Sequence, residues 1–147
     1  MAEVKRTYYE AGNLESEVFI IDGKKEGTYN SYHENGQLHT MCTYIDDKKN
    51  GTYKSYYETG ALNEFYTYTN DNLTGECKAY WRNGQLNVIG TYMNNKINGE
   101  YKVYWENGEL KYIYTYMNDN VNGECKSYYE NGELKETIIY ENGKKMN

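Results

Sequence analysis

Residues 51–74 read "GTYKSYYETGALNEFYTYTNDNLT", and the order of residue types in this segment indicates the fold class. Tyr, Thr and Phe gather in runs of about eight to eleven residues, and turn-forming residues separate the runs. The stretch shows no helical periodicity and no helix-capping pattern. It therefore predicts two β-strands joined by tight turns.

The same pattern returns at a step of 24 residues along the whole chain, which is typical of a repeat architecture. One glycine marks each copy, at Gly12, Gly36, Gly60, Gly84, Gly108 and Gly132. A second glycine keeps the same step, at Gly27, Gly51, Gly75, Gly99 and Gly123. The copies cover approximately residues 3–26, 27–50, 51–74, 75–98, 99–122 and 123–146. We expect residues 1–147 to form a single repeat array.

Each copy contains two turn sites, represented by Thr59-Gly60 and Asn70-Asp71. The residues at the second site tolerate a positive φ in every copy, as a two-residue type I′ hairpin turn requires. Two-residue turns at both sites leave strands of eleven and nine residues, which closes the 24-residue period. The predicted fold class is therefore all-β, an elongated single-layer antiparallel β-meander of about twelve strands. A three-residue Glu-Asn-Gly loop with a bulge is the alternative at the first site, and it would flip the relative faces of the two strands.

The two-residue register predicts one aromatic face and one mostly polar face. In the third copy the aromatic face receives Tyr53, Ser55, Tyr57, Leu62, Tyr66, Tyr68 and Leu73. The fifth copy places Tyr101, Val103, Trp105, Leu110, Tyr114, Tyr116 and Val121 on the same face. The polar face receives Lys54, Tyr56, Glu58, Asn63, Phe65 and Thr67. Gly51, Gly75 and Gly99 are expected on the aromatic face, where bare backbone lets neighbouring rings lie flat.

Composition narrows the class of partner and the compartment. The net charge of −6 argues against nucleic acid or an anionic membrane as the main partner. No apolar run approaches the ~18–20 residues of a transmembrane span, and the first residues lack the apolar core of a signal peptide. The three cysteines, Cys42, Cys77 and Cys125, are an odd number. We expect them to be reduced and partly buried, in a cytoplasmic protein.

The sequence offers little for catalysis. The two histidines, His33 and His39, are expected on opposite faces, where they cannot hold one metal ion. A column of glutamates lies at exposed turns and fits a solvated acidic edge: Glu10, Glu34, Glu58, Glu106 and Glu130. Phosphate-binding, dinucleotide-binding and nucleophile-elbow motifs are absent from the sequence. We therefore expect no catalytic residues, no cofactor and no metal site.

Three stretches carry a resemblance to a known family: "YKSYYETG" (residues 53–60), "CKAYWRNG" (77–84) and "YKVYWENG" (101–108). Each resembles the Y-x-G-x-W-x-x-G core of MORN repeats, in the variant form found in bacteria and giant viruses. The chain departs from that core at the middle glycine, which is replaced by Ser55, Ala79, Val103 or Ser127. The resemblance implies β-hairpin arrays that scaffold, dimerise or bind partners without catalysing a reaction. Some bacterial members are described as antitoxins. Lipid binding, proposed for some relatives, is not expected of this acidic chain.

The aromatic face is the candidate site, because a single sheet cannot bury its own face and an uncovered apolar strip marks an interaction surface. The residues expected to bind a partner are Tyr53, Tyr57, Tyr68, Trp81, Tyr92, Trp105, Tyr101, Tyr116 and Tyr129. We expect a protein partner or a second copy of the chain, and neither nucleic acid nor lipid. A carbohydrate or cell-wall ligand is the alternative, because stacked Tyr and Trp columns also suit sugar rings.

Overall fold

A computed structural model of the chain describes residues 1–146, and every regular element in these residues is a β-strand. The chain divides into two compact units, one formed by Met1–Asn72 and one that begins at Leu73. The division falls within β8 (Asn72–Leu73), in the third copy of the repeat. That residues 1–147 form one array stays a prediction.

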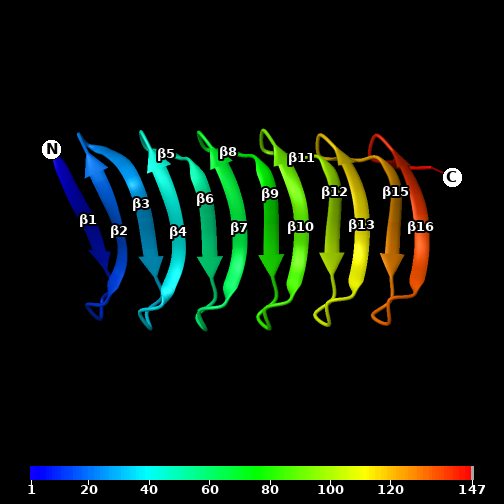
Figure 1. Ribbon diagram of the computed structural model, residues 1–147, viewed down its shortest axis with the longest axis horizontal. Coiled ribbons are helices and arrows are strands. Elements are labelled where there is room, and N and C mark those ends of the chain that lie inside the picture. The colour runs from blue at the N-terminus through cyan, green and yellow to red at the C-terminus, as the bar shows by residue number, and fades with distance from the viewer. Residues whose placement is uncertain (147) are drawn as a thin grey trace. The chain divides into compact units, whose positions relative to one another are not determined.

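The first unit is an antiparallel sheet in which strands that follow one another in sequence pair (Figure 1). Its strands are β1 (Ala2–Tyr8), β2 (Leu14–Ile21), β3 (Lys24–Tyr32), β4 (Leu38–Ile45), β5 (Lys48–Lys49), β6 (Gly51–Tyr56) and β7 (Leu62–Thr69). Strand β4 pairs with both β5 and β6, so these two labels denote successive parts of one interrupted strand.

The second unit repeats this arrangement. Its strands are β9 (Gly75–Tyr80), β10 (Leu86–Met93), β11 (Lys96–Ile97), β12 (Gly99–Tyr104), β13 (Leu110–Met117), β14 (Asn120–Val121), β15 (Gly123–Tyr128), β16 (Leu134–Glu141) and β17 (Lys144–Lys145). Here β10 pairs with β9, β11 and β12, and β13 pairs with β12, β14 and β15. The predicted class, an all-β antiparallel meander of 24-residue repeats, is confirmed.

The second turn of each copy is the predicted two-residue turn. In the fifth copy Asn118 and Asp119 have φ values of 51° and 68°, and they connect β13 to β14. A type I′ turn needs positive φ at both central residues, which Asn and Asp adopt more easily than most side chains do. The sequence therefore specified these turns through residue type alone.

The two-residue turn expected at the first site is wrong. The amide of Tyr57 donates to the carbonyl of Ala61 at 2.8 Å, and the amide of Gly60 donates to the carbonyl of Tyr57 at 2.8 Å. These bonds enclose the three-residue loop 58–60, and Gly60 closes it at a φ of 84°. This is the alternative named from the sequence, and it needs the positive φ that glycine supplies.

A bulge follows that loop and cancels its effect on the faces. Tyr56 pairs with Leu62, but Ser55 pairs with Glu64, so Asn63 is an extra residue. The Asn63 side-chain amide donates to Ser55 Oγ at 3.3 Å, which places Asn63 on the face of Ser55. Leu62 and Asn63 therefore lie on the faces opposite to those predicted. Leu110 in the fifth copy is likewise paired with Tyr104 rather than placed among the aromatic residues.

Beyond the bulge the predicted faces are restored, because the loop and the bulge each shift the alternation by one residue. Tyr53 pairs with Tyr66 in the first unit, and Tyr101 pairs with Tyr114 in the second. Val121 pairs with Tyr116, as the aromatic face requires. The aromatic face is thus observed within each unit.

The role predicted for the in-frame glycines is wrong. Gly99 has a φ of 82°, and a Cβ placed on it would meet no atom within 4 Å, so no ring lies over it. It follows Asn98, whose amide donates to the carbonyl of Thr91 where the strand is interrupted between β11 and β12. The glycine is needed for its positive φ at this irregularity. The glycine that does lie under a ring is Gly90, outside the 24-residue frame, where a Cβ would lie 2.4 Å from Cδ2 of Tyr101.

Within each unit, backbone and side-chain hydrogen bonds at both edges connect neighbouring copies. At the second turns, Asp119 Oδ1 accepts the amide of Ile97 at 2.7 Å, and the amide of Asp119 donates back to the carbonyl of Ile97 at 3.0 Å. At the first loops, the Asn107 side chain donates to the carbonyl of Glu130 at 2.8 Å. These contacts satisfy turn groups that a single layer leaves open to solvent.

The core of this one-layer sheet is thin. The buried residues are Val18, Cys42, Ser55, Cys77, Gly90 and Cys125. Among the described residues no side chain is less than 2% exposed. The three cysteines are free thiols, and burial raises the pKa of each. Small side chains occupy the centre of the aromatic face because large rings stand beside them.

Candidate functional site

The aromatic face of the second unit is a set of mutually contacting tyrosines. The ring centroids of Tyr101 and Tyr116 lie 5.7 Å apart in an edge-to-face arrangement. Tyr114 lies 6.0 Å from Tyr116 and 5.6 Å from Tyr112. Burial is the main cause that raises the pKa of Tyr101 to about 12. The rings are therefore packed but half-buried, with one side open.

The first unit has an equivalent aromatic face, and two lysine side chains lie over its tyrosine rings. Tyr53 lies 6.0 Å from Tyr66 and 6.1 Å from Tyr68, measured between ring centroids. The Lys49 ammonium lies 5.2 Å from the Tyr53 ring and 5.1 Å from the Tyr68 ring, and Lys25 lies 5.0 Å from the ring of Tyr44. Neither lysine was expected at the site from the sequence.

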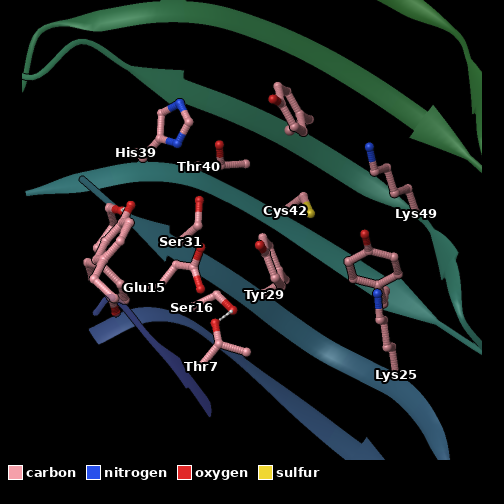
Figure 2. A pocket seen from close by; sticks show the side chains of 14 residues that line it. Thr7, Glu15, Ser16, Lys25, Tyr29, Ser31, His39, Thr40, Cys42 and Lys49 are labelled. Atoms are coloured by element: carbon pink, nitrogen blue, oxygen red, sulfur yellow. Dashed lines mark hydrogen bonds between the residues drawn. The ribbon is translucent and has the colours of Figure 1, made fainter. Parts of the chain in front are cut away.

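A hollow of about 630 Å³ lies on this part of the first unit (Figure 2). Hydroxyl groups, tyrosine rings and the two lysines line it together. Its residues include Thr7, Ser16, Ser31, Thr40, Tyr29, Tyr44, Tyr53, Lys25 and Lys49. Burial is the main cause that raises the pKa of Tyr44 to about 12.

The ring column beside the first loops links neighbouring copies. Trp81 Nε1 donates to the carbonyl of Tyr104 at 3.2 Å, and Trp105 Nε1 donates to the carbonyl of Tyr128 at 3.4 Å. In the first unit Tyr9 makes the same bond through its hydroxyl. Indole and phenol can both fill this column because both combine an apolar body with a polar tip. These bonds could not be predicted from the sequence.

Both tryptophans line one hollow of about 430 Å³ in the second unit, with Glu106, Asn107, Lys111 and Glu130. The Lys111 ammonium lies 4.0 Å from the centroid of the Trp105 ring. Lys111 occupies the bulge position of its copy, the position of Asn63 in the third copy. This contact depends on the bulge, so the two-residue register could not predict it.

The sequence of this meander matches the model of one protein family, the MORN repeat variant. The matched segments are residues 4–22, 25–46, 49–70, 73–94, 97–118 and 121–142. The chain belongs to the MORN repeat variant family. MORN repeats are in general protein- or membrane-interaction repeats, and the family is not catalytic. No curated protein matches the chain. Within residues 1–146 no helix could cross a membrane.

The second MORN copy contains both histidines, and their predicted placement on opposite faces is wrong. The rings of His33 and His39 lie 4.4 Å apart, because His39 occupies the bulge position and points to the face of His33. His33 Nε2 lies 2.9 Å from the carbonyl of Tyr56 and donates to it. Burial lowers the pKa of His39, and the neighbouring His33 lowers it further. Among residues 1–146 no group of three candidate ligands for a metal ion is present.

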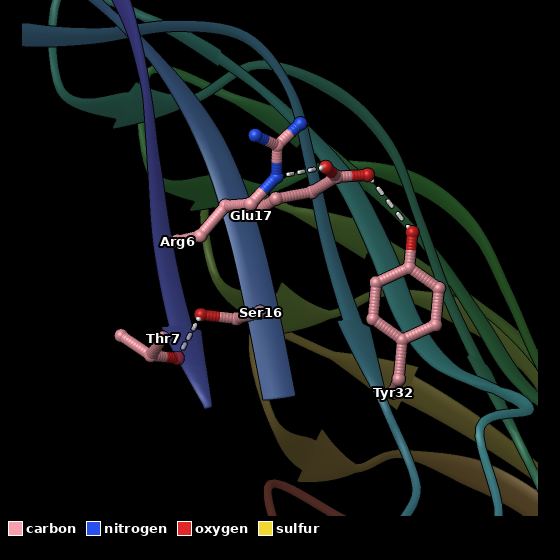
Figure 3. Close-up of polar contacts among 5 residues, drawn as sticks. All are labelled: Arg6, Thr7, Ser16, Glu17 and Tyr32. Atoms are coloured by element: carbon pink, nitrogen blue, oxygen red, sulfur yellow. Dashed lines mark hydrogen bonds and ion pairs between the residues drawn. The ribbon is translucent and has the colours of Figure 1, made fainter. Parts of the chain in front are cut away.

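The opposite face of the MORN sheet carries polar and ionic contacts (Figure 3). Tyr32 donates its hydroxyl to Glu17 Oε1 at 2.9 Å, and Arg6 Nε lies 3.3 Å from Glu17 Oε2. The hydrogen bond from Tyr32 is the largest cause of a lowered pKa of the Glu17 carboxyl, and burial opposes it. In the second unit Lys126 pairs with Glu124 at 3.0 Å on this side of β15. These contacts are polar, as predicted for this face, but the face also exposes the apolar side chains Phe19, Met93 and Met117.

The structure places the nine residues proposed for partner binding as follows. Tyr53 and Tyr68 contact each other in the first unit, and Tyr101 and Tyr116 do so in the second. The other five are Tyr57, Trp81, Tyr92, Trp105 and Tyr129. All nine are half-buried except Tyr129, which is 51% exposed. Whether they bind a partner stays a prediction.

Proposed function

We propose that this MORN protein is a non-enzymatic scaffold that binds a protein partner, or a second copy of itself, through its aromatic face. The observation that supports this best is the open side of that face. Within each unit the described residues form one sheet, and no second layer covers the rings of residues such as Tyr53 and Tyr101. Tyrosine and tryptophan supply large, rigid contact areas at low entropic cost, which is why they are frequent at binding hot spots.

The resemblance to bacterial MORN proteins described as antitoxins suggests one class of partner, a protein toxin that this chain neutralises. The three free thiols, Cys42, Cys77 and Cys125, are compatible with a reducing compartment, and we propose a cytoplasmic location. The net charge of −6 favours a partner with a basic surface over an anionic membrane.

The test compares the association and the stability of two matched double variants. Trp81→Ala with Trp105→Ala truncates the two largest rings of the face. Met93→Ala with Met117→Ala truncates two exposed apolar side chains that strand alternation places on the other face of the same unit. We expect the tryptophan pair to weaken binding to a captured partner, or self-association in sedimentation, by about 2–4 kcal/mol. The methionine pair should leave association unchanged.

The competing interpretation is that the tryptophans only join neighbouring copies through their Nε1 bonds. Each truncation would then lower the free energy of unfolding by about 3–5 kcal/mol, and association measured on the folded fraction would be unaffected. Chemical denaturation and sedimentation on the same samples separate the two interpretations. Normal association by a folded tryptophan variant would contradict the proposal.

A carbohydrate ligand is the second candidate, and the hydroxyl-lined hollow of the first unit favours it. Thr7, Ser16, Ser31 and Thr40 supply hydroxyls beside the tyrosine rings there. Sugars bind to combinations of aromatic rings and small polar groups. A glycan array tests this function directly. Binding that Tyr29→Ala abolishes, without loss of folding, would support a carbohydrate module in place of a protein scaffold.

A further inference from the structure

The tryptophan hollow of the second unit already holds a positively charged group. The Lys111 ammonium lies 4.0 Å from the centre of the Trp105 ring and 5.6 Å from that of Tyr112. Tryptophan is the aromatic side chain that attracts a cation most strongly. The geometry thus shows an ammonium seated on one of the two indoles that line the hollow.

The other indole has no such partner in its own copy. Trp81 occupies the column of Trp105, but the position equivalent to Lys111 is Asn87. The sixth copy does have the pair, because Lys135 lies 5.5 Å from the Tyr129 ring. The fourth copy therefore combines tryptophan, which attracts a cation more strongly than tyrosine does, with an uncharged neighbour. Among residues 1–146 no lysine ammonium lies over the Trp81 ring.

Two carboxylates complete the wall of the hollow. Glu106 and Glu130 line it, and their side chains form no ion pair within residues 1–146. Their backbone carbonyls are engaged by Asn83 and Asn107, which fixes the loops that carry them. In the fourth copy Arg82 stands in the glutamate column, but it does not line the hollow. Carboxylates beside an aromatic face strengthen its attraction for a cation.

We infer that this hollow receives a lysine or arginine side chain of the partner protein, with Trp81 as the ring that it covers and Glu106 and Glu130 as the compensating charges. This inference rests on the proposed function, since it gives the aromatic face a basic protein segment as its occupant. Lys111 is the internal cation that competes for the same hollow. A neutral sugar would use the rings but would gain nothing from the two carboxylates.

Tryptophan fluorescence, excited at the long-wavelength edge where tyrosine does not absorb, reports on this site, because Trp81 and Trp105 are the only tryptophans in the chain. The probes are an acetylated and amidated tetralysine peptide, the corresponding tetraglutamate peptide and cellobiose. We expect a saturable change with tetralysine at low ionic strength, weakened by added salt, and none with the other two probes. A saturable change with cellobiose and none with tetralysine would overturn the inference in favour of a sugar site.

Two pairs of variants give the inference its sharpest test. Lys111→Asn removes the internal competitor and introduces the residue found at the same position in the third and fourth copies. It should tighten tetralysine binding by about threefold to tenfold, whereas Lys135→Asn, at the equivalent site outside the hollow, should not. Glu106→Gln with Glu130→Gln should weaken binding by at least about threefold.

The double variant Glu34→Gln with Glu58→Gln removes the same amount of charge from the first unit. It is the matched control for the weaker tetralysine binding expected of Glu106→Gln with Glu130→Gln. Equal weakening by both glutamate pairs would show general attraction to an acidic protein and would overturn the inference. Weaker binding by Lys111→Asn would overturn it as well. The proposed function is tested separately. If association depends on the tryptophans but tetralysine causes no fluorescence change, the cation site is rejected and the scaffold function is still supported.

Discussion

The substitution Gly90→Ala tests how the thin core is packed. A Cβ at residue 90 would lie 2.4 Å from Cδ2 and 3.0 Å from Cε2 of Tyr101, and 3.5 Å from the sulfur of Cys77. Carbon atoms pack at about 3.5–4.0 Å, so the ring must retreat by roughly 1 Å. Cδ2 is close to the backbone attachment of Tyr101, and the ring also contacts Tyr116, so the retreat cannot be a simple rotation at the tip.

The expected cost combines two opposing terms. Overpacking of a filled site costs about 1–3 kcal/mol. Replacing glycine by alanine restricts the unfolded chain and returns about 0.4–1 kcal/mol where the backbone is compatible, and Gly90 is not among the glycines with positive φ. We expect a net loss of about 1–2 kcal/mol in the free energy of unfolding, measured by chemical denaturation. The pKa of Tyr101 should also fall from about 12 as the displaced ring becomes more exposed.

Double-variant analysis isolates the steric cause. In a Tyr101→Cys background, which introduces the residue that Cys77 and Cys125 supply in the same column, Gly90→Ala should cost nothing. Gly99→Ala is the control: it meets no atom but has a φ of 82°, so its cost of about 1 kcal/mol should be independent of residue 101. A cost of Gly90→Ala that persists without the Tyr101 ring would refute this description of the core.

Three further predictions concern pH and the contacts between copies. The pKa of Glu17 is lowered in the folded state, chiefly by the Tyr32 hydroxyl, so its contribution to stability is complete above the ordinary carboxyl value of 4.5 and is lost as pH falls. Glu17→Gln should therefore lower the thermal midpoint at neutral pH, and the difference from the natural chain should close in acid. The pKa of Tyr101 is raised to about 12 from 10.0, so its contribution is complete below pH 10.0 and is lost as pH rises towards 12. Alkaline unfolding followed by circular dichroism should therefore begin above pH 10.0, and Tyr101→Phe, which has no hydroxyl to ionise, should unfold at a higher pH; an unchanged midpoint of alkaline unfolding would contradict this. Asp119→Ala removes the acceptor for the Ile97 amide and should cost about 1 kcal/mol, whereas Asp119→Asn, which keeps the acceptor as Asn95 does in the fourth copy, should cost much less.

The repeat period and the second turns could be predicted from the sequence because each depends on local residue type. Asn118 and Asp119 accept positive φ in any context, and the glycines of the first loops recur at a fixed step. The bulge at Asn63 could not be predicted in this way. The three-residue loop shifts the strand alternation by one residue, and the bulge shifts it back. A copy with both features and a copy with neither therefore have the same 24-residue period, so the period cannot distinguish them.

The part of the site that was missed follows from that bulge. Lys111 and His39 occupy bulge positions. The bulge turns Lys111 to the face of Trp105 and His39 to the face of His33, and a regular strand would point both side chains to the opposite face. The aromatic columns themselves were placed correctly, because they lie beyond the compensating pair of shifts. The glycines differ in a related way: those in the frame serve the backbone, as Gly99 does, whereas Gly90, which lies outside the frame, makes room for a side chain.

The proposed binding residues also hold the repeats together, and this overlap follows from the one-layer architecture. A single sheet leaves each ring partly exposed, so the side of Trp81 or Trp105 that faces the neighbouring copy contributes stability while the other side remains open. Truncation to alanine removes both contributions at once. The substitution Trp81→Tyr separates the two contributions. Tyr9 occupies the equivalent position in the first copy and makes the equivalent bond, so tyrosine keeps a ring with a polar tip, but it attracts a cation less strongly than tryptophan does. The repeats thus provide, in their own sequence, the substitutions that distinguish a structural ring from a binding ring.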